Sequence, residues 1–325
     1  MKKKAFKILF TCAGRRVSLL RSFRAALSRE GFKPVILGTD MTELSAALQI
    51  CDKQFIVKPT SHNGYIRELA KIVRNEQVRV IIPTIDLDLK VLAESKEKFE
   101  SVGCTVLVSD PEVVHICQDK RRTYRFLTAN GFDTPRTVSV STALSQKSPK
   151  WPCFIKPWDG YASRGTAVVK NRKELLFYSK KIPNPIVQQY IEGTEYTCDV
   201  YVDFDMKVRC VVPRMRIETR AGEVSKGRTV KNESIIGQTA RLVETLKAGP
   251  GVITIQLIVA KEDDSEIRFI EINPRFGGGV PLSIKAGANF PKWIIRELTG
   301  RDLEIRPEAY RDNLTMLRYD GEIWL

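Results

Sequence analysis

Short apolar strands alternate with amphipathic helices over residues 5–109, and this alternation limits the fold more than any other feature of the chain. The strand "AFKILF" at 5–10 precedes a helix that ends at Gly31 and has an apolar face of Val17, Leu20, Phe23 and Leu27. The further strands expected are 34–39, 53–57, 78–84 and 104–109, with helices at 63–76 and 87–100. Such alternation predicts a parallel sheet with helices packed on its faces.

Two loops of this Rossmann-like first domain follow strands, where ligands of parallel sheets bind. The loop "TCAGRR" at 11–16 could hold an anion near Gly14 and the next helix N-terminus, but it lacks the full G-x-G-x-x-G pattern of a dinucleotide site. In "PTIDLD", Asp86 and Asp88 are either ligand contacts or helix caps. Asp40 is a ribose contact if a dinucleotide binds, and otherwise a turn residue.

The organisation changes after residue 110. Helical sequence at 110–131 leads to a strand, a glycine-containing loop and a strand at 151–170. The remainder is mostly antiparallel, with a helix at 233–247 and a hairpin formed by 251–260 and 266–273. The fold class predicted is therefore α/β, with an α+β C-terminal part.

The stretch "FIEINPRFGGG" at 269–279 carries polar side chains at every second position. Successive side chains of a strand point to opposite faces, so an apolar face is expected to continue into a polar one. By this alternation the residues of that face are Ile267, Phe269, Glu271, Asn273 and Arg275. This pattern is typical of a core face that runs out into a site, and a strand edge that meets water is the alternative.

Across the hairpin, Gln256 is expected near position 270 or 271. Gln256, Glu271 and Asn273 would then converge as three oxygen ligands of the kind that Mg²⁺ or Mn²⁺ prefers. One carboxylate with two amides is a poor cage for a cation alone. It suits a cation whose remaining oxygens come from substrate phosphates, so the hairpin predicts magnesium-bound ATP.

Lys156 ends a strand just before the loop "DGYASRG". A lysine beside the N–H groups of a glycine loop can hold a polyphosphate, although the loop is not a Walker A motif. A single lysine of this kind is more often a surface residue. Together with the hairpin ligands, it favours a phosphate site.

This combination resembles the ATP-grasp superfamily over nearly the whole chain. The Gln/Glu/Asn set, "TCAGRR" and "SDPEVVHICQDK" look most like one synthetase unit of the carbamoyl phosphate synthetase large subunit, here as a stand-alone relative. The resemblance implies an ATP-grasp fold in which two α+β subdomains sandwich ATP. It divides the chain into a Rossmann-like domain at 1–112, a small central subdomain at 113–187 and a C-terminal subdomain at 188–325.

The resemblance also implies roles for individual residues. The residues implied to bind ATP are Lys120, Lys156, Ser163, Arg164, Gly165, Gln188, Gln189, Ile191 and Glu195. Among them, Gln188 takes the adenine amino group and Glu195 the ribose. The metal ligands implied are Gln256, Glu271 and Asn273, and Arg275 matches the arginine that neutralises the transferring phosphate.

Arg214 and Arg216 alternate toward one face, where they either hold the acceptor carboxylate or form a solvated strand face. Lys226 is expected in a lid over the site or, alternatively, in a basic loop. The chain is too short for the full large subunit, which carries two synthetase units. Lys120 stands where that enzyme tends to have arginine, and Gln188 where many relatives have an acid.

The function implied is an ATP- and magnesium-dependent ligase, with ATP and two Mg²⁺ or Mn²⁺ ions. It would activate a carboxylate as an acylphosphate that an amine or related nucleophile attacks. The alternatives are an ATP-binding regulatory or sensor protein without turnover, and a carboxyphosphate-forming relative of carbamoyl phosphate synthetase. A nicotinamide enzyme that uses the first domain is a further, weaker alternative.

The partners expected are ATP and an anionic small-molecule carboxylate, with a homodimer as one admissible assembly. A net charge of +15 also suits nucleic acid, but no nucleic-acid module appears, so that partner is not expected. No apolar run approaches a membrane span. Seven scattered cysteines without a C-x-x-C pair indicate reduced thiols and a cytoplasmic location.

Overall fold

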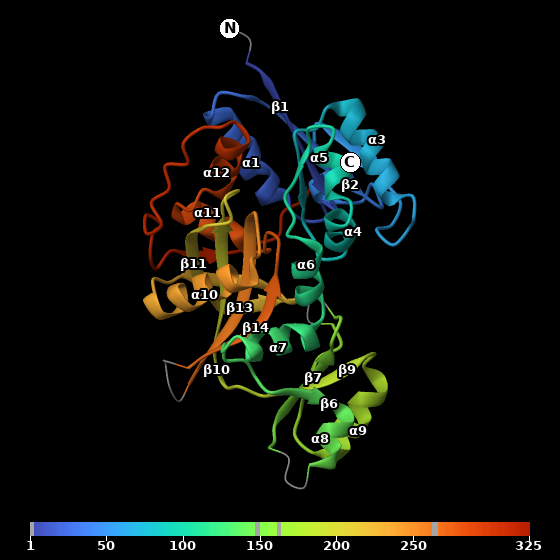
Figure 1. The fold of residues 1–325 in the computed structure, drawn as a ribbon, viewed down its shortest axis with the longest axis vertical. Coiled ribbons are helices and arrows are strands. Elements are labelled where there is room, and N and C mark those ends of the chain that lie inside the picture. Colours follow the sequence, from blue (N-terminus) through green and yellow to red (C-terminus); the bar gives the residue numbers. More distant parts are fainter. Residues whose placement is uncertain (1–2, 147–149, 161–163, 262–265) are drawn as a thin grey trace.

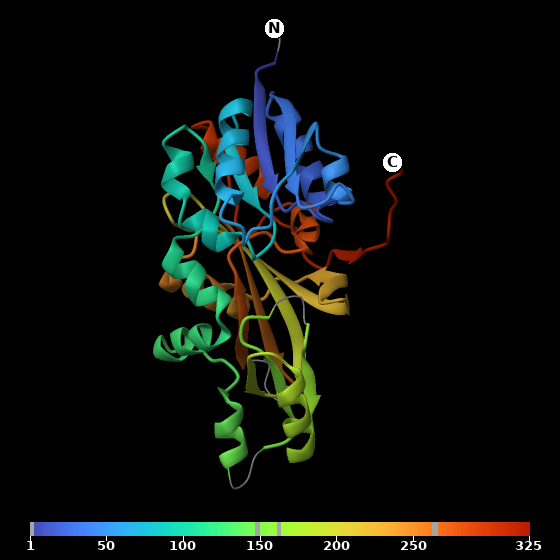
Figure 2. The same cartoon turned by 90° about the vertical axis from the view of Figure 1, so that its right-hand side faces the viewer.

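The computed structural model describes residues 3–146, 150–160, 164–261 and 266–325. Within these ranges the chain forms three sheets that follow one another along the long axis of the molecule (Figure 1). The first sheet lies at one end and a four-stranded sheet at the other. A six-stranded sheet lies between them, and its long strands span the distance (Figure 2).

The first sheet is parallel, in the order β3-β2-β1-β4-β5. Its strands are β1 (Ala5–Thr11), β2 (Lys33–Asp40), β3 (Lys53–Ile56), β4 (Val80–Pro83) and β5 (Thr105–Val106). The helices between them are α1 (Val17–Arg29), α2 (Ala46–Gln49), α3 (Tyr65–Glu76), α4 (Leu89–Ala93) and α5 (Lys96–Glu100). The parallel sheet predicted from the alternation is confirmed. The single helix expected at 87–100 is interrupted at Ser95, whose φ of −113° is not helical.

Two short helices, α6 (Pro111–Gln118) and α7 (Lys120–Ala129), lead to the four-stranded sheet. The side chain of Asp119 caps α7 by accepting a bond from the N–H of Arg121, so α7 begins at Lys120. The sheet is antiparallel, in the order β6-β9-β7-β8. Its elements are β6 (Thr137–Ser139), α8 (Val140–Ser145), β7 (Cys153–Pro157), β8 (Ala167–Val169), α9 (Arg172–Lys181) and β9 (Pro185–Gln189).

The six-stranded sheet is antiparallel, in the order β14-β13-β10-β11-β12-β15. Its strands are β10 (Gly193–Val202), β11 (Val208–Arg220), β12 (Glu223–Thr229), β13 (Gly251–Ala260), β14 (Ile267–Asn273) and β15 (Thr315–Leu317). Helix α10 (Glu233–Leu246) buries Ile235, Leu242 and Val243 in the core on one face of this sheet. The mixed α/β class predicted is confirmed.

The last two helices, α11 (Val280–Ala286) and α12 (Phe290–Leu298), pack beside α1 (Figure 1). Phe290 and Ile294 therefore share one buried core with Phe10 and Phe23 of the first sheet and its helix. The chain thus returns at its C-terminal end to complete the core that its N-terminal end began.

The pairing of β13 with β14 contains a β-bulge, and it corrects the expected faces of β14. Leu257 pairs with Phe269 and Gln256 with Glu271, so Ile270 is an extra residue. The extra residue shifts the alternation by one. Ile267 and Phe269 therefore share the buried face with Ile272, and Glu271 and Asn273 lie on the opposite face with Gln256 and Thr254.

The division expected at 112/113 and 187/188 remains a prediction, and these points fall inside α6 and β9. No helix in the described ranges is long and apolar enough to cross a bilayer. All seven cysteines are free thiols, and five of them are buried.

A buried ion pair joins β10, β11 and α11. Arg214 Nε and Nη2 lie 2.8 Å and 2.9 Å from the two carboxylate oxygens of Asp199, and the Ser283 hydroxyl donates to the same carboxylate at 2.6 Å. Arg214 is 1% exposed and Asp199 is not exposed. The low-dielectric surroundings make each charge depend on the other.

We expect the substitution Arg214→Met to lower the free energy of unfolding by about 3–5 kcal/mol, because it leaves the Asp199 carboxylate buried without its cation. Urea denaturation measures this change. The exposed pair of Arg220 with Asp320 is the control, and Arg220→Met should change stability little. The double variant Asp199→Asn/Arg214→Met should recover part of the loss. Equal stability of the two arginine variants would contradict the prediction.

Candidate functional site

Two cavities meet on the face of the six-stranded sheet opposite α10. One, of about 310 Å³, lies toward the four-stranded sheet and contains Lys120 and Lys156, and we call it the lysine cavity. The other, of about 270 Å³, lies toward the first domain, and we call it the arginine cavity after its four arginines, Arg16, Arg214, Arg216 and Arg275. Three residues line both cavities: Arg216, Gln256 and Glu271.

The structure brings most of the residues named from the sequence to these cavities. Those that line the lysine cavity are Lys120, Lys156, Arg164, Gln188, Gln189, Ile191, Glu195, Gln256 and Glu271. Asn273 and Arg275 line the arginine cavity. Gly165 lies in the chain between two lining residues, Arg164 and Thr166, but does not line the cavity itself. Ser163 lies outside the described residues.

The two lysines approach one carboxylate from different elements. Lys120, the first residue of α7, places Nζ 3.4 Å from Glu271 Oε1 and donates to the carbonyl of Gly160. Lys156 in β7 is only 5% exposed and forms no ion pair with any residue in the described ranges. The pKa of Lys156 is lowered to about 8, chiefly by burial and also by the charge of Lys120, while the carboxylates of Glu271 and Glu195 oppose the shift.

The segment 188–195 forms another wall of the lysine cavity. Gln188 is buried and donates from Nε2 to the Thr137 hydroxyl at 3.0 Å. The N–H of Gln189 donates to the carbonyl of Arg136. Glu195 is half-exposed and lies 3.0 Å from Arg216 Nε, so its carboxylate is paired with a cavity arginine.

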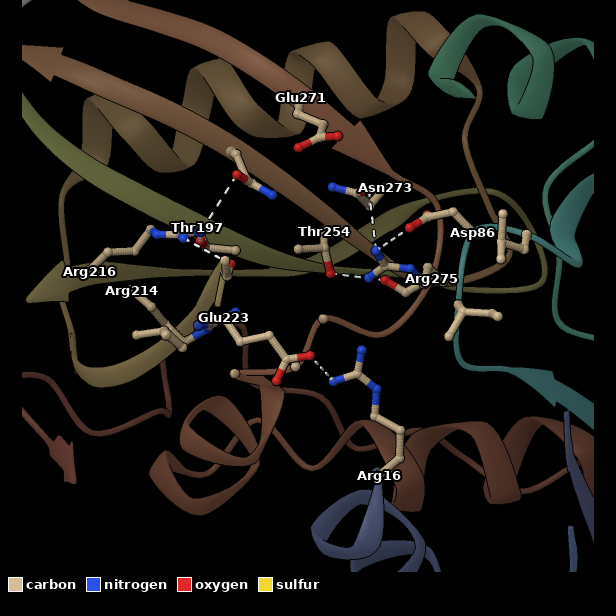
Figure 3. Close-up of a pocket in the computed structure, with 18 residues that line it drawn as sticks. Arg16, Asp86, Thr197, Arg214, Arg216, Glu223, Thr254, Glu271, Asn273 and Arg275 are labelled. Atoms are coloured by element: carbon tan, nitrogen blue, oxygen red, sulfur yellow. Dashed lines mark hydrogen bonds and ion pairs between the residues drawn. The ribbon is translucent and has the colours of Figure 1, made fainter. Parts of the chain in front are cut away.

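The three predicted oxygen ligands lie on one face of the sheet, and a basic nitrogen approaches each. Figure 3 shows Glu271, Asn273 and Arg275 at this face. Gln256 Oε1 is 3.5 Å from Arg216 Nη1, and Asn273 Oδ1 is 3.3 Å from Arg275 Nη2. Glu271 has Lys120 in the same role. These hard oxygen donors match the chemistry of Mg²⁺. The described residues contain no group of three or more His, Cys, Asp or Glu side chains that could hold a metal.

The two acids of "PTIDLD", expected as ligand contacts or helix caps, lie in different surroundings. Asp86 lines the arginine cavity. Its carboxylate forms an ion pair with Arg275 across the arginine cavity (Figure 3). Burial would lower the pKa of Arg275, but the carboxylates of Asp86, Glu271 and Glu223 together outweigh it and raise that pKa. Asp88 instead turns inward, where Thr11 donates to it at 2.6 Å, and burial raises its pKa to about 6. The Asp88 side chain does not cap α4.

The loop "TCAGRR" makes contacts of two kinds. The N–H of Gly14 donates to Asp40 Oδ2, and the N–H of Met41 donates to Asp40 Oδ1, so Asp40 acts as a turn residue. Arg16 faces the arginine cavity, where its Nη1 lies 2.9 Å from Glu223 Oε1 (Figure 3). Glu223 was not predicted, because β12 carries no clear strand pattern that would have placed it.

Two of the three glycines after β14, Gly278 and Gly279, make room for arginines. A Cβ on Gly278 would come within 2.6 Å of Arg16 Nη1, and one on Gly279 within 2.3 Å of Arg214 Nη1. Arg214 is paired with Asp199 and lines the arginine cavity alone, whereas Arg216 lines both cavities. Lys226, expected in a lid or basic loop, lies in β12 and pairs with Glu218.

Two family models match the chain. Residues 117–279 match "ATP-grasp domain", and residues 8–107 match "PylC-like, N-terminal domain". The first match covers both lysines, the oxygen set and the three glycines.

Curated relatives match at low identity. The carbamoyl phosphate synthase large chain of Vibrio cholerae is 22% identical over 299 residues, which is 86% of this chain and 27% of that protein. The D-alanine–D-alanine ligase A of Bacillus cereus is 24% identical over 151 residues, or 41% of this chain and 50% of that protein. The chain thus spans between about a quarter and a half of the length of these relatives.

Solved structures share the fold. The biotin carboxylase domain of Hydrogenobacter thermophilus 2-oxoglutarate carboxylase, solved as a dimer with MgADP, ADP and bicarbonate, has a TM-score of 0.75 at 18% identity, covering 96% of this chain and 74% of that one. The L-amino acid ligase of Bacillus licheniformis has a TM-score of 0.71 at 18% identity, covering 94% and 78%. The ATP-grasp match spans half of the chain and the fold agrees with it, so this chain belongs to the ATP-grasp domain family, with a PylC-like N-terminal domain.

Proposed function

We propose that the protein is an ATP- and magnesium-dependent ligase that activates a carboxylate as an acylphosphate for attack by an amine or related nucleophile. The observation that carries this proposal is the meeting of the two cavities at Arg216, Gln256 and Glu271. A phosphate donor in the lysine cavity and an anionic acceptor in the arginine cavity would face each other at these three residues.

ATP would occupy the lysine cavity. Lys156 supports this assignment, since it is buried and forms no ion pair with a described carboxylate, and a polyphosphate would supply a direct counter-charge. Lys120 and Arg164 line the same space and would add to the phosphate site. Gln188, Gln189 and Ile191 would contact adenine, and Glu195 the ribose. Ser163 and Gly165 would belong to the phosphate-covering loop.

Magnesium or manganese, with two ions proposed, would be held by Gln256, Glu271 and Asn273 together with phosphate oxygens of ATP. When bound, the metal neutralises phosphate charge. The single carboxylate of this set suits a ligand that brings several negative charges of its own. Arg216, Lys120 and Arg275, which contact these three oxygens in the structure, would then contact phosphate oxygens instead.

The chemistry proposed has two balanced steps. A carboxylate oxygen attacks the γ-phosphorus, the bond to the ADP oxygen breaks, and ADP leaves with its electron pair. The amine then attacks the acyl carbon, phosphate leaves, and the amine loses a proton. Arg216 lies where the cavities meet and Arg275 lines the arginine cavity, and both would neutralise the transferring group. Because the protein positions groups and compensates charge, it needs no covalent intermediate of its own.

Two other functions compete with this proposal. A carboxyphosphate-forming relative of carbamoyl phosphate synthase would use bicarbonate as the acceptor, and the related carboxylase domain was solved with bicarbonate. A sensor protein would bind ATP without turnover. The free thiols favour action in a reducing compartment such as the cytoplasm. A homodimer is a proposal that rests on the related carboxylase domain alone.

The direct test follows release of ADP and phosphate in the presence of ATP, Mg²⁺ and pools of organic acids and amines. We expect ADP release to require one acid pool and one amine pool. Release with bicarbonate alone would assign the carbamoyl phosphate synthase type of chemistry. Binding of ATP with no release under any pool would favour the sensor.

We expect Glu271→Gln to lower the rate of ADP release by roughly 100-fold, because it removes the only carboxylate of the oxygen set. The control is Glu266→Gln, which removes the same charge from the same hairpin outside both cavities. ADP release at saturating ATP and a series of Mg²⁺ concentrations measures the effect. A similar loss in both variants would contradict the role of Glu271.

The pKa of Lys156 predicts how ATP affinity depends on pH. Below pH 8 the amine is protonated and the affinity should be nearly constant. Above pH 8 the free protein loses this proton, so the Kd for ATP should rise, by at most about tenfold per pH unit. Arginine stays protonated, so Lys156→Arg should flatten this slope. Calorimetric titration of ATP between pH 7 and 9.5 measures both. The same slope in both proteins would rule out Lys156 as its origin.

A further inference from the structure

The far end of the arginine cavity carries more positive charge than its carboxylates balance. Glu223 has three arginines within 4 Å: Arg16 at 2.9 Å, Arg318 at 3.2 Å and Arg15 at 3.8 Å. Burial would raise the pKa of Glu223, but these arginines outweigh it and lower that pKa. A second carboxylate, Asp320, also interacts with Arg15 and Arg318 but is paired with Arg220. Two negative charges therefore face four positive ones, and the local surplus is positive.

Arg16 is the member of this group that lines the cavity. Its side chain is 16% exposed, and burial lowers its pKa, as does the charge of Arg275, while Glu223 opposes the shift. Gly278 lies against its guanidinium, and a Cβ at this position would clash with Arg16. Figure 3 shows Arg16 and Glu223 across the cavity from Glu271 and Asn273.

The start of α1 adds to the positive potential at the same place. The helix has 13 residues, no side-chain cap and no acidic residue in its first turn. Its N–H groups and dipole therefore favour an anion beside Arg16. This helix end only supports the arginine group, which provides the charge and lines the cavity.

We infer that the substrate of the arginine cavity carries two anionic groups. The first is the carboxylate that reacts, at the end shared by Arg216 and Arg275. The second, a carboxylate or a phosphate, binds Arg16 beside Glu223, so Arg16 selects dianions over monoanions. The inference rests on the proposed function for the reacting end, and goes beyond it in assigning the substrate class and a specificity residue from the first domain.

The competing explanation is structural: the arginines tie β12 and the segment after β15 to the loop 11–16 through Glu223. The two explanations differ in what Glu223 does. If it only anchors the arginines, its loss should damage the site as the loss of Arg16 does. If it competes with a substrate anion for Arg16, removing its charge should leave dianion binding intact or strengthen it.

The test is calorimetric titration of dicarboxylates from malonate to adipate, each beside the monocarboxylate of the same chain length. A parallel series replaces one carboxylate by phosphonate and so distinguishes the two chemistries. Titrations are made without nucleotide and with Mg²⁺ and a non-hydrolysable ATP analogue. We expect at least one dianion to bind roughly tenfold more tightly than its monoanion, the size of one charge-assisted hydrogen bond.

Three variants make the result specific. Arg16→Gln should remove the preference for dianions, and Arg21→Gln, the same change on the exposed face of α1, should keep it. Glu223→Gln should bind the dianion at least as tightly as the native protein. The melting temperature of each variant shows that it is folded.

The inference is overturned if no dianion is preferred under either condition, if the two arginine variants behave alike, or if Glu223→Gln loses as much binding as Arg16→Gln. These outcomes are independent of turnover. A dianion preference without ADP release would overturn the ligase alone, and turnover of a monocarboxylate without any dianion preference would overturn the dianion inference alone.

Discussion

The register of β13 against β14 is the constraint on which the site depends. The bulge at Ile270 lets β14 bury Phe269 and Ile272 on one face while it presents Glu271 on the other. In an unbroken strand the residue two places from Phe269 would point into the core, where a carboxylate is costly. The one extra residue thus keeps the apolar side chains on the core face and turns Glu271 to the cavity face, opposite Gln256.

Charge compensation across different segments holds the remaining groups in place. Arg275 is paired with Asp86 of the first domain, Arg216 with Glu195 of β10, and Lys120 with Glu271. Each pair joins two elements, so the cations keep defined positions before any ligand arrives. Lys156 differs from them, since its pKa reflects burial more than any partner. A polyphosphate would therefore gain most from Lys156 and would compete with protein carboxylates for the other cations.

Local sequence patterns predicted much of this architecture, and tertiary contacts account for the rest. The alternation over 5–109 and the Gln256–Glu271 pairing were accessible, because strand periodicity and hairpin length are local properties. The bulge at Ile270 was not, since alternation assumes an unbroken strand. The contact of Arg16 with Glu223 was not accessible either, because the two residues lie more than 200 positions apart in the chain. The sequence around a charged side chain does not reveal which distant residue it pairs with.

Helix α1 connects the two ends of the arginine cavity. Arg16 lies immediately before α1, and Phe23 within α1 packs edge-on against Phe276, with ring centroids 5.8 Å apart. Phe276 directly follows Arg275 in the chain, so a movement of α1 would shift both arginines together. Because α11 and α12 share the core of the first sheet, the first domain cannot separate from the C-terminal part without exposing that core. The distance between the two ends of the cavity is therefore set by buried aromatic packing, and this fixed span is what would allow the site to measure the length of a substrate.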